Sequence, residues 1–260
     1  ALPICYLMSC KHFLPVLCLF FSLLAAGCAS SAQPPAPPES EAAYLGKIVQ
    51  LDNDALLLAA TDGQSEALAS VSLHDLSLAD SHGATLAAAD LACGMTVSVG
   101  FDGTLLETYP LQLSGASSLT VLSQEDDLVG FYLTVFDDLY ARDPGLNDGV
   151  TRLAFDLDAV SNLTPAEKAA LIWLAGSHFQ MDTYAATYQD LLADGTLTDA
   201  EPYFTDGLLI TLSAAALENG RFTFEVQKWR STLGAYSFTN CTAQKSDGTW
   251  HYTIGAEAIS

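Results

Sequence analysis

The chain has 260 residues, half of them hydrophobic, which is enough for one large or two small globular domains. Its formal net charge is −22, and the acid-rich stretch from Ile48 to Ala141 contains no Lys or Arg. A negative field of this size repels phosphate backbones and anionic lipid surfaces, which excludes nucleic acid as a partner. The same field would attract cations or basic peptides, although it also serves solubility alone.

The N-terminal residues are typical of an export signal. From Met8, the expected true start, a short basic segment leads into an apolar run from Phe13 to Ala26. This run is shorter than the roughly 20 residues of a membrane span. It ends in Leu24-Ala25-Ala26-Gly27-Cys28, which resembles the bacterial lipobox, a motif whose cysteine receives a diacylglycerol before the chain is cut in front of it. We therefore expect residues 1–27 to be a signal peptide; a plain secretory signal that happens to contain a cysteine is the alternative.

Cys28 is the expected lipid attachment site, and two acyl chains suffice for stable anchoring. Residues 28–43 are rich in Pro, Ala and Ser, a composition that cannot bury enough apolar surface to fold and that favours polyproline II. They predict a stiff tether, with the membrane as a partner through the anchor. The expected location is the extracellular face of the cell membrane, and the expected state is a monomer.

Residues 44–122 predict an all-β domain. Apolar or alternating runs occur at Tyr44 to Leu51, Ala55 to Ala60, Leu68 to Leu73, Leu86 to Gly94, Thr96 to Phe101, Leu105 to Tyr109 and Leu119 to Leu122, separated by turn residues such as Asp102-Gly103. The segments Gly46-Lys47-Ile48, Leu91 to Val97 and Glu107 to Gln112 resemble a small uncharacterised domain of Gram-positive bacterial lipoproteins. That resemblance implies an OB-like five-stranded barrel, with no activity attached to it.

Residues 123–260 predict an α+β domain. Helices are expected from Ser123 to about Tyr140, from the capping box Thr164-Pro165-Ala166-Glu167 to about Ser177, and from Thr183 to Ala193, with a short strand at Arg152 to Leu157. Period-two runs follow at Leu208 to Leu212, Arg221 to Arg230, Gly234 to Ala243 and Trp250 to Ile254. They predict a four-stranded antiparallel meander with the helices packed on one side. The segments Lys228 to Tyr236 and Trp250 to Gly255 resemble the C-terminal part of uncharacterised lipoproteins from gut-dwelling Gram-positive bacteria, a resemblance that carries no known chemistry.

Alternation in the last three strands assigns residues to two faces of the sheet. The expected core face holds Phe222, Phe224, Val226, Tyr236, Phe238, Trp250, Tyr252 and Ile254. The opposite face holds Cys241, Thr253 and the most site-like group of the sequence, which is Glu225, Gln227, Trp229, Ser237, Thr239 and His251. An aromatic platform among small polar groups would suit a peptide or a sugar ring. The alternatives are that a bulge turns Trp229 inward or that the first domain covers this face.

Motifs for catalysis, metals or cofactors are not found. Asp190 to Glu201 has a passing likeness to a calcium loop, but Leu192 occupies a ligand position, and helix capping around Gly195 explains the pattern. Cys93 and Cys241 are the two cysteines beyond the anchor, and we expect free buried thiols rather than a disulfide. The sequence thus predicts a cell-surface lipoprotein that binds an unknown peptide, glycan or protein without catalysis. The alternative is an extracellular hydrolase with a dispersed site, using His251 or His178 with nearby acids.

Overall fold

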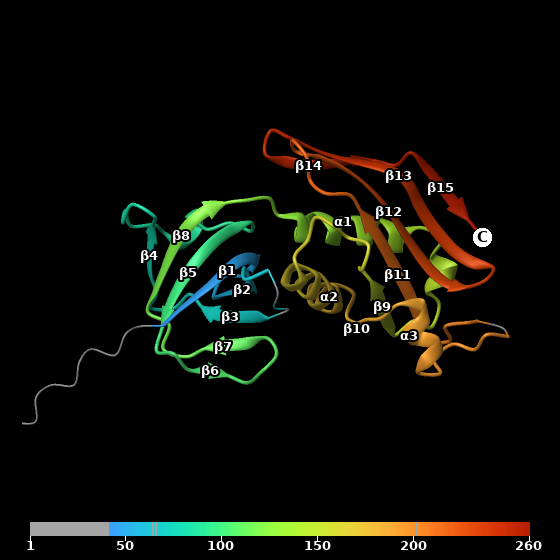
Figure 1. Cartoon of the computed structure of the whole chain (residues 1–260), viewed down its shortest axis with the longest axis horizontal. Coiled ribbons are helices and arrows are strands. Elements are labelled where there is room, and N and C mark those ends of the chain that lie inside the picture. The colour runs from blue at the N-terminus through green and yellow to red at the C-terminus, as the bar shows by residue number, and fades with distance from the viewer. Residues whose placement is uncertain (1–41, 64, 66, 201) are drawn as a thin grey trace, which may run out of the picture. The chain divides into compact units, whose positions relative to one another are not determined.

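A computed structural model describes residues 42–260 apart from residues 64, 66 and 201, and its strands form two mixed β-sheets (Figure 1). The expected signal peptide, Cys28 and all but the last two residues of the expected tether lie outside the described residues. Among the described residues, no helix is both long and apolar enough to cross a membrane.

The first sheet contains eight strands in the order β4-β8-β5-β1-β2-β3-β7-β6. Their bounds are β1 Ala42–Leu51, β2 Ala55–Ala60, β3 Leu68–Ser72, β4 Ser77–Asp80, β5 Met95–Phe101, β6 Leu105–Leu106, β7 Leu111–Leu113 and β8 Ser118–Gln124, with a 3-10 turn, η1, at Ala88–Asp90. Most neighbours are antiparallel, but β3 pairs with β7 and β4 with β8 in parallel.

The expected OB-like barrel is wrong, because this sheet stays open between β4 and β6 in the described part of the chain. The run from Leu86 to Gly94 forms the η1 turn instead of a strand, and the expected strand at Leu105 ends after Leu106. The edge strands β4 and β6 are only four and two residues long, which is too short for them to pair with each other and close a barrel.

The second sheet contains seven strands. The path β10-β9-β11-β12-β13-β14 is extended by β15, which pairs with the other half of β13. Bounds are β9 Arg152–Asp156, β10 Asp182–Ala185, β11 Gly207–Ala214, β12 Arg221–Ser231, β13 Gly234–Ser246, β14 Thr249–Thr253 and β15 Ala256–Ile259. The helices are α1 Leu128–Ala141, α2 Pro165–Phe179 and α3 Tyr188–Ala193, with a 3-10 turn, η2, at Pro144–Asn147.

The expected meander with helices on one side is also wrong as a description of the whole sheet. Strands β9, β10 and β11 are parallel, because α2 carries the chain from β9 to β10 and α3 lies on the way to β11. The α1 and α2 helices contribute to the main core, whereas Leu191 of α3 belongs to a separate cluster with Ala154 and Leu209. Helices therefore cover both faces around β9, and the chain is mostly β with two mixed sheets.

Two predicted helix starts moved for identifiable reasons. Ser123 and Gln124 remain in β8, and Asp127 caps α1 instead by accepting the Gly130 amide at 2.9 Å. The expected helix from Thr183 is instead β10 followed by α3, which Thr187 caps. The capping box of α2 is confirmed, because Thr164 and Glu167 each accept the other's backbone N–H.

The main hydrophobic core joins the two sheets. Val49, Leu57 and Leu68 of the first sheet belong to the same buried cluster as the inner residues of α1, α2 and the second sheet. The predicted core face is confirmed, with Phe222, Phe224, Val226, Tyr236 and Phe238 buried in this cluster and Trp250, Tyr252 and Ile254 packed against it. Apolar side chains from both halves of the chain therefore share one water-free interior.

Cys241 lies in this core rather than on the polar face where alternation placed it. Four residues of β13, from Phe238 to Cys241, lie opposite three residues of β12, from Val226 to Phe224. Asn240 has a φ of 52°, the left-handed conformation of a bulge, and the extra residue reverses the alternation beyond it. Cys93 and Cys241 are both free, and burial raises the pKa of each thiol to about 11.

Candidate functional site

The structure brings together only part of the polar face predicted from the sequence. Gln227 on β12 lies opposite Ser237 on β13, and its side-chain amide donates to the Ser237 hydroxyl at 2.9 Å. Glu225 is exposed at the bulge and accepts the Asn240 amide at 3.4 Å. Thr239 donates to the Ala256 carbonyl at 3.3 Å, since β15 covers that end of β13.

Trp229 is half-buried. Tyr188, the first residue of α3, meets its ring edge to face at a centroid distance of 5.4 Å. The indole packs against the small cluster around Leu191 and Leu209. Packing against α3 therefore accounts for the position of Trp229. Neither alternative drawn from the sequence, a bulge or cover by the first domain, named this helix.

His251 lies apart from these residues, exposed on β14. It lines a shallow, open cavity of about 520 Å³ together with Phe131, Trp250 and Tyr252. Glu225, Gln227 and Thr239 of the predicted face thus hydrogen bond to a neighbouring side chain or to the backbone.

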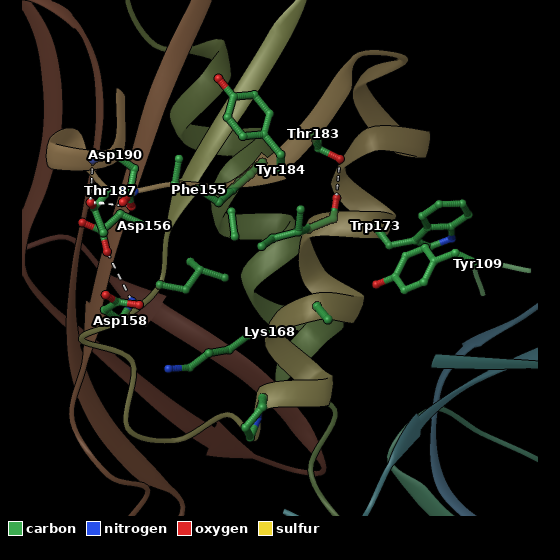
Figure 2. A pocket seen from close by; sticks show the side chains of 16 residues that line it. Tyr109, Phe155, Asp156, Asp158, Lys168, Trp173, Thr183, Tyr184, Thr187 and Asp190 are labelled. Atoms are coloured by element: carbon green, nitrogen blue, oxygen red, sulfur yellow. Dashed lines mark hydrogen bonds between the residues drawn. The ribbon is translucent and has the colours of Figure 1, made fainter. Parts of the chain in front are cut away.

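A deeper cavity of about 500 Å³ lies between α2 and β10 (Figure 2). The α2 helix packs beside β10, and the Thr183 hydroxyl donates to the Ile172 carbonyl at 2.8 Å. Gly176 permits this close approach, because a Cβ there would lie 2.7 Å from the Thr183 hydroxyl oxygen. The cavity continues to the carboxyl ends of β9 and β10, the edge where open parallel sheets usually bind their ligands.

One end of the cavity is acidic. Asp156 is the last residue of β9, Asp158 follows it, and Asp190 comes from the first turn of α3. The Asp158 amide donates to Asp156 at 3.3 Å. Asp190 accepts the Thr187 amide and hydroxyl at 2.8 and 2.7 Å, and these hydrogen bonds lower the pKa of Asp190.

Lys168 is the cation of the cavity lining. It extends from α2 on the same side as the carboxylates in Figure 2. Within the described part of the chain, its ammonium group is in no ion pair. Asp156 and Asp158 likewise have no basic partner there, so these groups can hydrogen bond to a ligand.

The other end of the cavity is aromatic. Trp173 of α2 and Tyr109, from the loop between β6 and β7, are 38% and 58% exposed. Their rings meet edge to face with centroids 5.4 Å apart. Such rings can cover apolar groups or the C–H faces of a ligand while staying in contact with water. The cavity therefore offers an aromatic wall, a helix, a strand and a polar end.

Sequence reasoning missed this cavity. The segment Thr183 to Ala185 was assigned to a helix, and Tyr109 was placed at the end of a strand. The available signal was the short buried run Leu153-Ala154-Phe155 followed by Asp156 and Asp158, which is typical of a parallel strand ending at a site.

The hydrolase alternative has one supporting contact, from His178 to Asp137. The His178 Nε2 atom lies 2.9 Å from the Asp137 carboxylate on the surface formed by α2 and α1. No serine or cysteine is hydrogen bonded to His178 among the residues that the structure describes, so no nucleophile can be named there. In the same residues, no group of three His, Cys, Asp or Glu is placed to hold a metal ion.

No protein-family model matches the chain, and no match to it was found among curated proteins.

Proposed function

We propose that the protein is a non-catalytic binding module, held at the extracellular face of the cell membrane by a lipid on Cys28. Its ligand would occupy the cavity between α2 and β10. The observation that carries this proposal is the cavity itself, where polar groups at one end and exposed aromatic rings at the other converge on about 500 Å³. Ligand sites usually combine a concave shape, apolar walls and a few orienting polar groups.

The lining favours some ligands over others. Asp156, Asp158 and Asp190 outnumber Lys168, and the whole chain carries a net charge of −22. Phosphates and other polyanions are therefore poor candidates, whereas cationic or neutral hydrogen-bonding ligands are suited to the acidic end.

Filling the cavity is expected to abolish ligand binding. Ala169 is a half-buried residue of α2 that lines the cavity and packs against the main core, and Ala169→Phe would place a ring inside the cavity. We expect one of three probe classes (acetylated peptide amides, oligosaccharides or polyamines) to raise the melting temperature of the full chain in detergent. The shift should be about 5 °C at roughly a hundredfold excess over Kd, and it should vanish in A169F.

The control is Ala141→Phe, which adds the same ring at the exposed end of α1 and should leave the shift intact. Failure of all three classes to bind, or equal shifts in A169F and the wild type, would refute the proposed site.

The proposed anchor predicts that Cys28→Ala abolishes lipid attachment. Without the sulfur, no diacylglycerol can be attached, and the chain keeps the apolar run that is otherwise cut away. The measurement is incorporation of a labelled fatty acid by expressing cells, with Cys93→Ala as the control that keeps Cys28. Labelling of C28A, or a wild type without label, would contradict the anchor and leave the cavity proposal standing.

A further inference from the structure

One wall of the cavity is the unpaired edge of a β-sheet. Strand β10 pairs with β9 and with no other described strand. The amides of Asp182 and Ala186 donate to carbonyls of the β9 side, at 3.2 and 3.0 Å. Because backbone groups alternate along a strand, those of Thr183 and Ala185 face the open edge.

This open edge borders the cavity. Thr183 and Ala185 both line it, and Ala169 and Ile172 of α2 form the opposite wall. A groove between a helix and an edge strand suits an extended chain, which can hydrogen bond to the strand and place alternate side chains against the helix. Four residues of β10 offer about 13 Å of edge at about 3.3 Å per residue.

The two ends of this groove differ in chemistry. Asp156 is the last residue of β9 and Asp158 follows it, whereas Trp173 lies near Thr183 at the amino end of β10 (Figure 2). Carboxylates without a basic partner favour an ammonium or guanidinium group, and the exposed aromatic ring favours an apolar side chain. Lys168 does not reverse this preference, because three carboxylates line the same cavity.

We propose, resting on the binding function above, that the ligand is an extended peptide that adds as a strand to the free edge of β10. A basic side chain of this peptide occupies the acidic end of the cavity, beside Asp156 and Asp158. The backbone groups of Thr183 and Ala185 supply the shared hydrogen bonds, so recognition depends on peptide backbone as well as on side chains.

The test uses N-acetylated hexapeptide amide libraries with one fixed Lys or one fixed Glu, added to the full chain in detergent. We expect binding from the Lys library and at least tenfold weaker binding from the Glu library. Ala185→Pro removes one amide from the open edge, where the β9 ladder does not use it, and should weaken the best Lys peptide by about tenfold. Ala185→Ser keeps the amide and should weaken binding far less than A185P does.

A second arm leaves the protein unchanged. N-methylation of the best peptide, one amide at a time, should weaken binding at alternate positions only, because alternate amides of an added strand face β10. This arm decides the question even if A185P does not fold. Asp158→Asn should weaken the Lys peptide and leave a peptide with the Lys replaced by Ala unaffected.

The outcomes separate this inference from the proposed function. A peptide that A169F excludes but that neither A185P nor N-methylation weakens would overturn strand addition and leave the binding site intact. Binding of an oligosaccharide or a polyamine alone, blocked by A169F, would do the same. Absence of any binding would overturn both.

Discussion

Lys47→Met is expected to lower the free energy of unfolding by about 3 kcal/mol, because it leaves a buried carboxylate without its counter-ion. The Lys47 ammonium lies 2.8 Å from one oxygen of Glu167, and the two side chains are 12% and 7% exposed. The other Glu167 oxygen accepts the Thr164 amide at 2.9 Å and so caps α2. Glu125 lies 3.5 Å away and is half-exposed, so water can still screen it.

The pair links β1 of the first sheet to α2, and Lys47 is the only basic residue between residues 42 and 141. Glu167→Gln should cost less, about 1 to 2 kcal/mol, because Gln can still cap the helix and Lys47 keeps Glu125. The loss of unfolding free energy in the double variant should be smaller than the sum of the two single losses by at least about 1 kcal/mol. Urea unfolding measures all three, and additive losses would show that the two groups do not interact.

Local signals in the sequence predicted many elements. The capping box of Thr164 and Glu167 fixes the start of α2 through two hydrogen bonds within four residues, so no distant contact is needed. Period two in the last strands placed Phe222, Phe224 and Phe238 on the core face, because that pattern follows directly from the pleat.

Predictions failed where distant parts of the chain decide the structure. Thr183 to Ala185 could continue a helix locally, but pairing with β9 makes them a strand. Cys241 moved to the core because the bulge at Asn240 adds one residue to β13, and nothing in the alternation marks it. The first sheet stays open because its edge strands are short. The run from Leu105 to Tyr109 predicted a longer strand than β6, which ends at Leu106.

The candidate site could not be predicted from the sequence for the same reason. Its walls come from the β6–β7 loop, β9, α2, β10 and α3, and only the parallel pairing of β9 with β10 brings them together. The predicted face on β12 to β14 was a reasonable group in sequence, yet α3 covers its Trp229 through Tyr188. A covering helix from the opposite side of the sheet leaves no trace in strand alternation.

Lys228→Met is the second substitution with a large expected loss, about 3 kcal/mol. Lys228 is fully buried on β12, and its ammonium donates to backbone carbonyls of Tyr140, Arg142 and Asp143 and to the Asn147 side chain. These oxygens follow the C-terminus of α1, where a positive charge also interacts favourably with the helix dipole. Methionine would fill the space and remove the ammonium from the Arg142 carbonyl and the Asn147 side-chain oxygen, whereas the Tyr140 and Asp143 carbonyls keep the Asn147 side-chain amide and the Leu146 amide as donors.

The pH dependence of this loss has a definite sign. Burial lowers the pKa of Lys228 to about 8, below the ordinary lysine value, so the folded protein releases this proton before the unfolded chain does. As pH rises from 8 towards 10, the unfolded chain binds more protons, and the wild type gains stability relative to K228M. Titrations of Tyr and Cys are common to both proteins and cancel in the difference.

Lys245→Met removes a partly exposed ion pair with Asp126 and should cost less than about 1 kcal/mol at any of these pH values. Equal losses in K228M and K245M would show that Lys228 does not hold the end of α1. A K228M loss that shrinks with rising pH would show that folding raises the pKa of Lys228 and would contradict the predicted pH dependence.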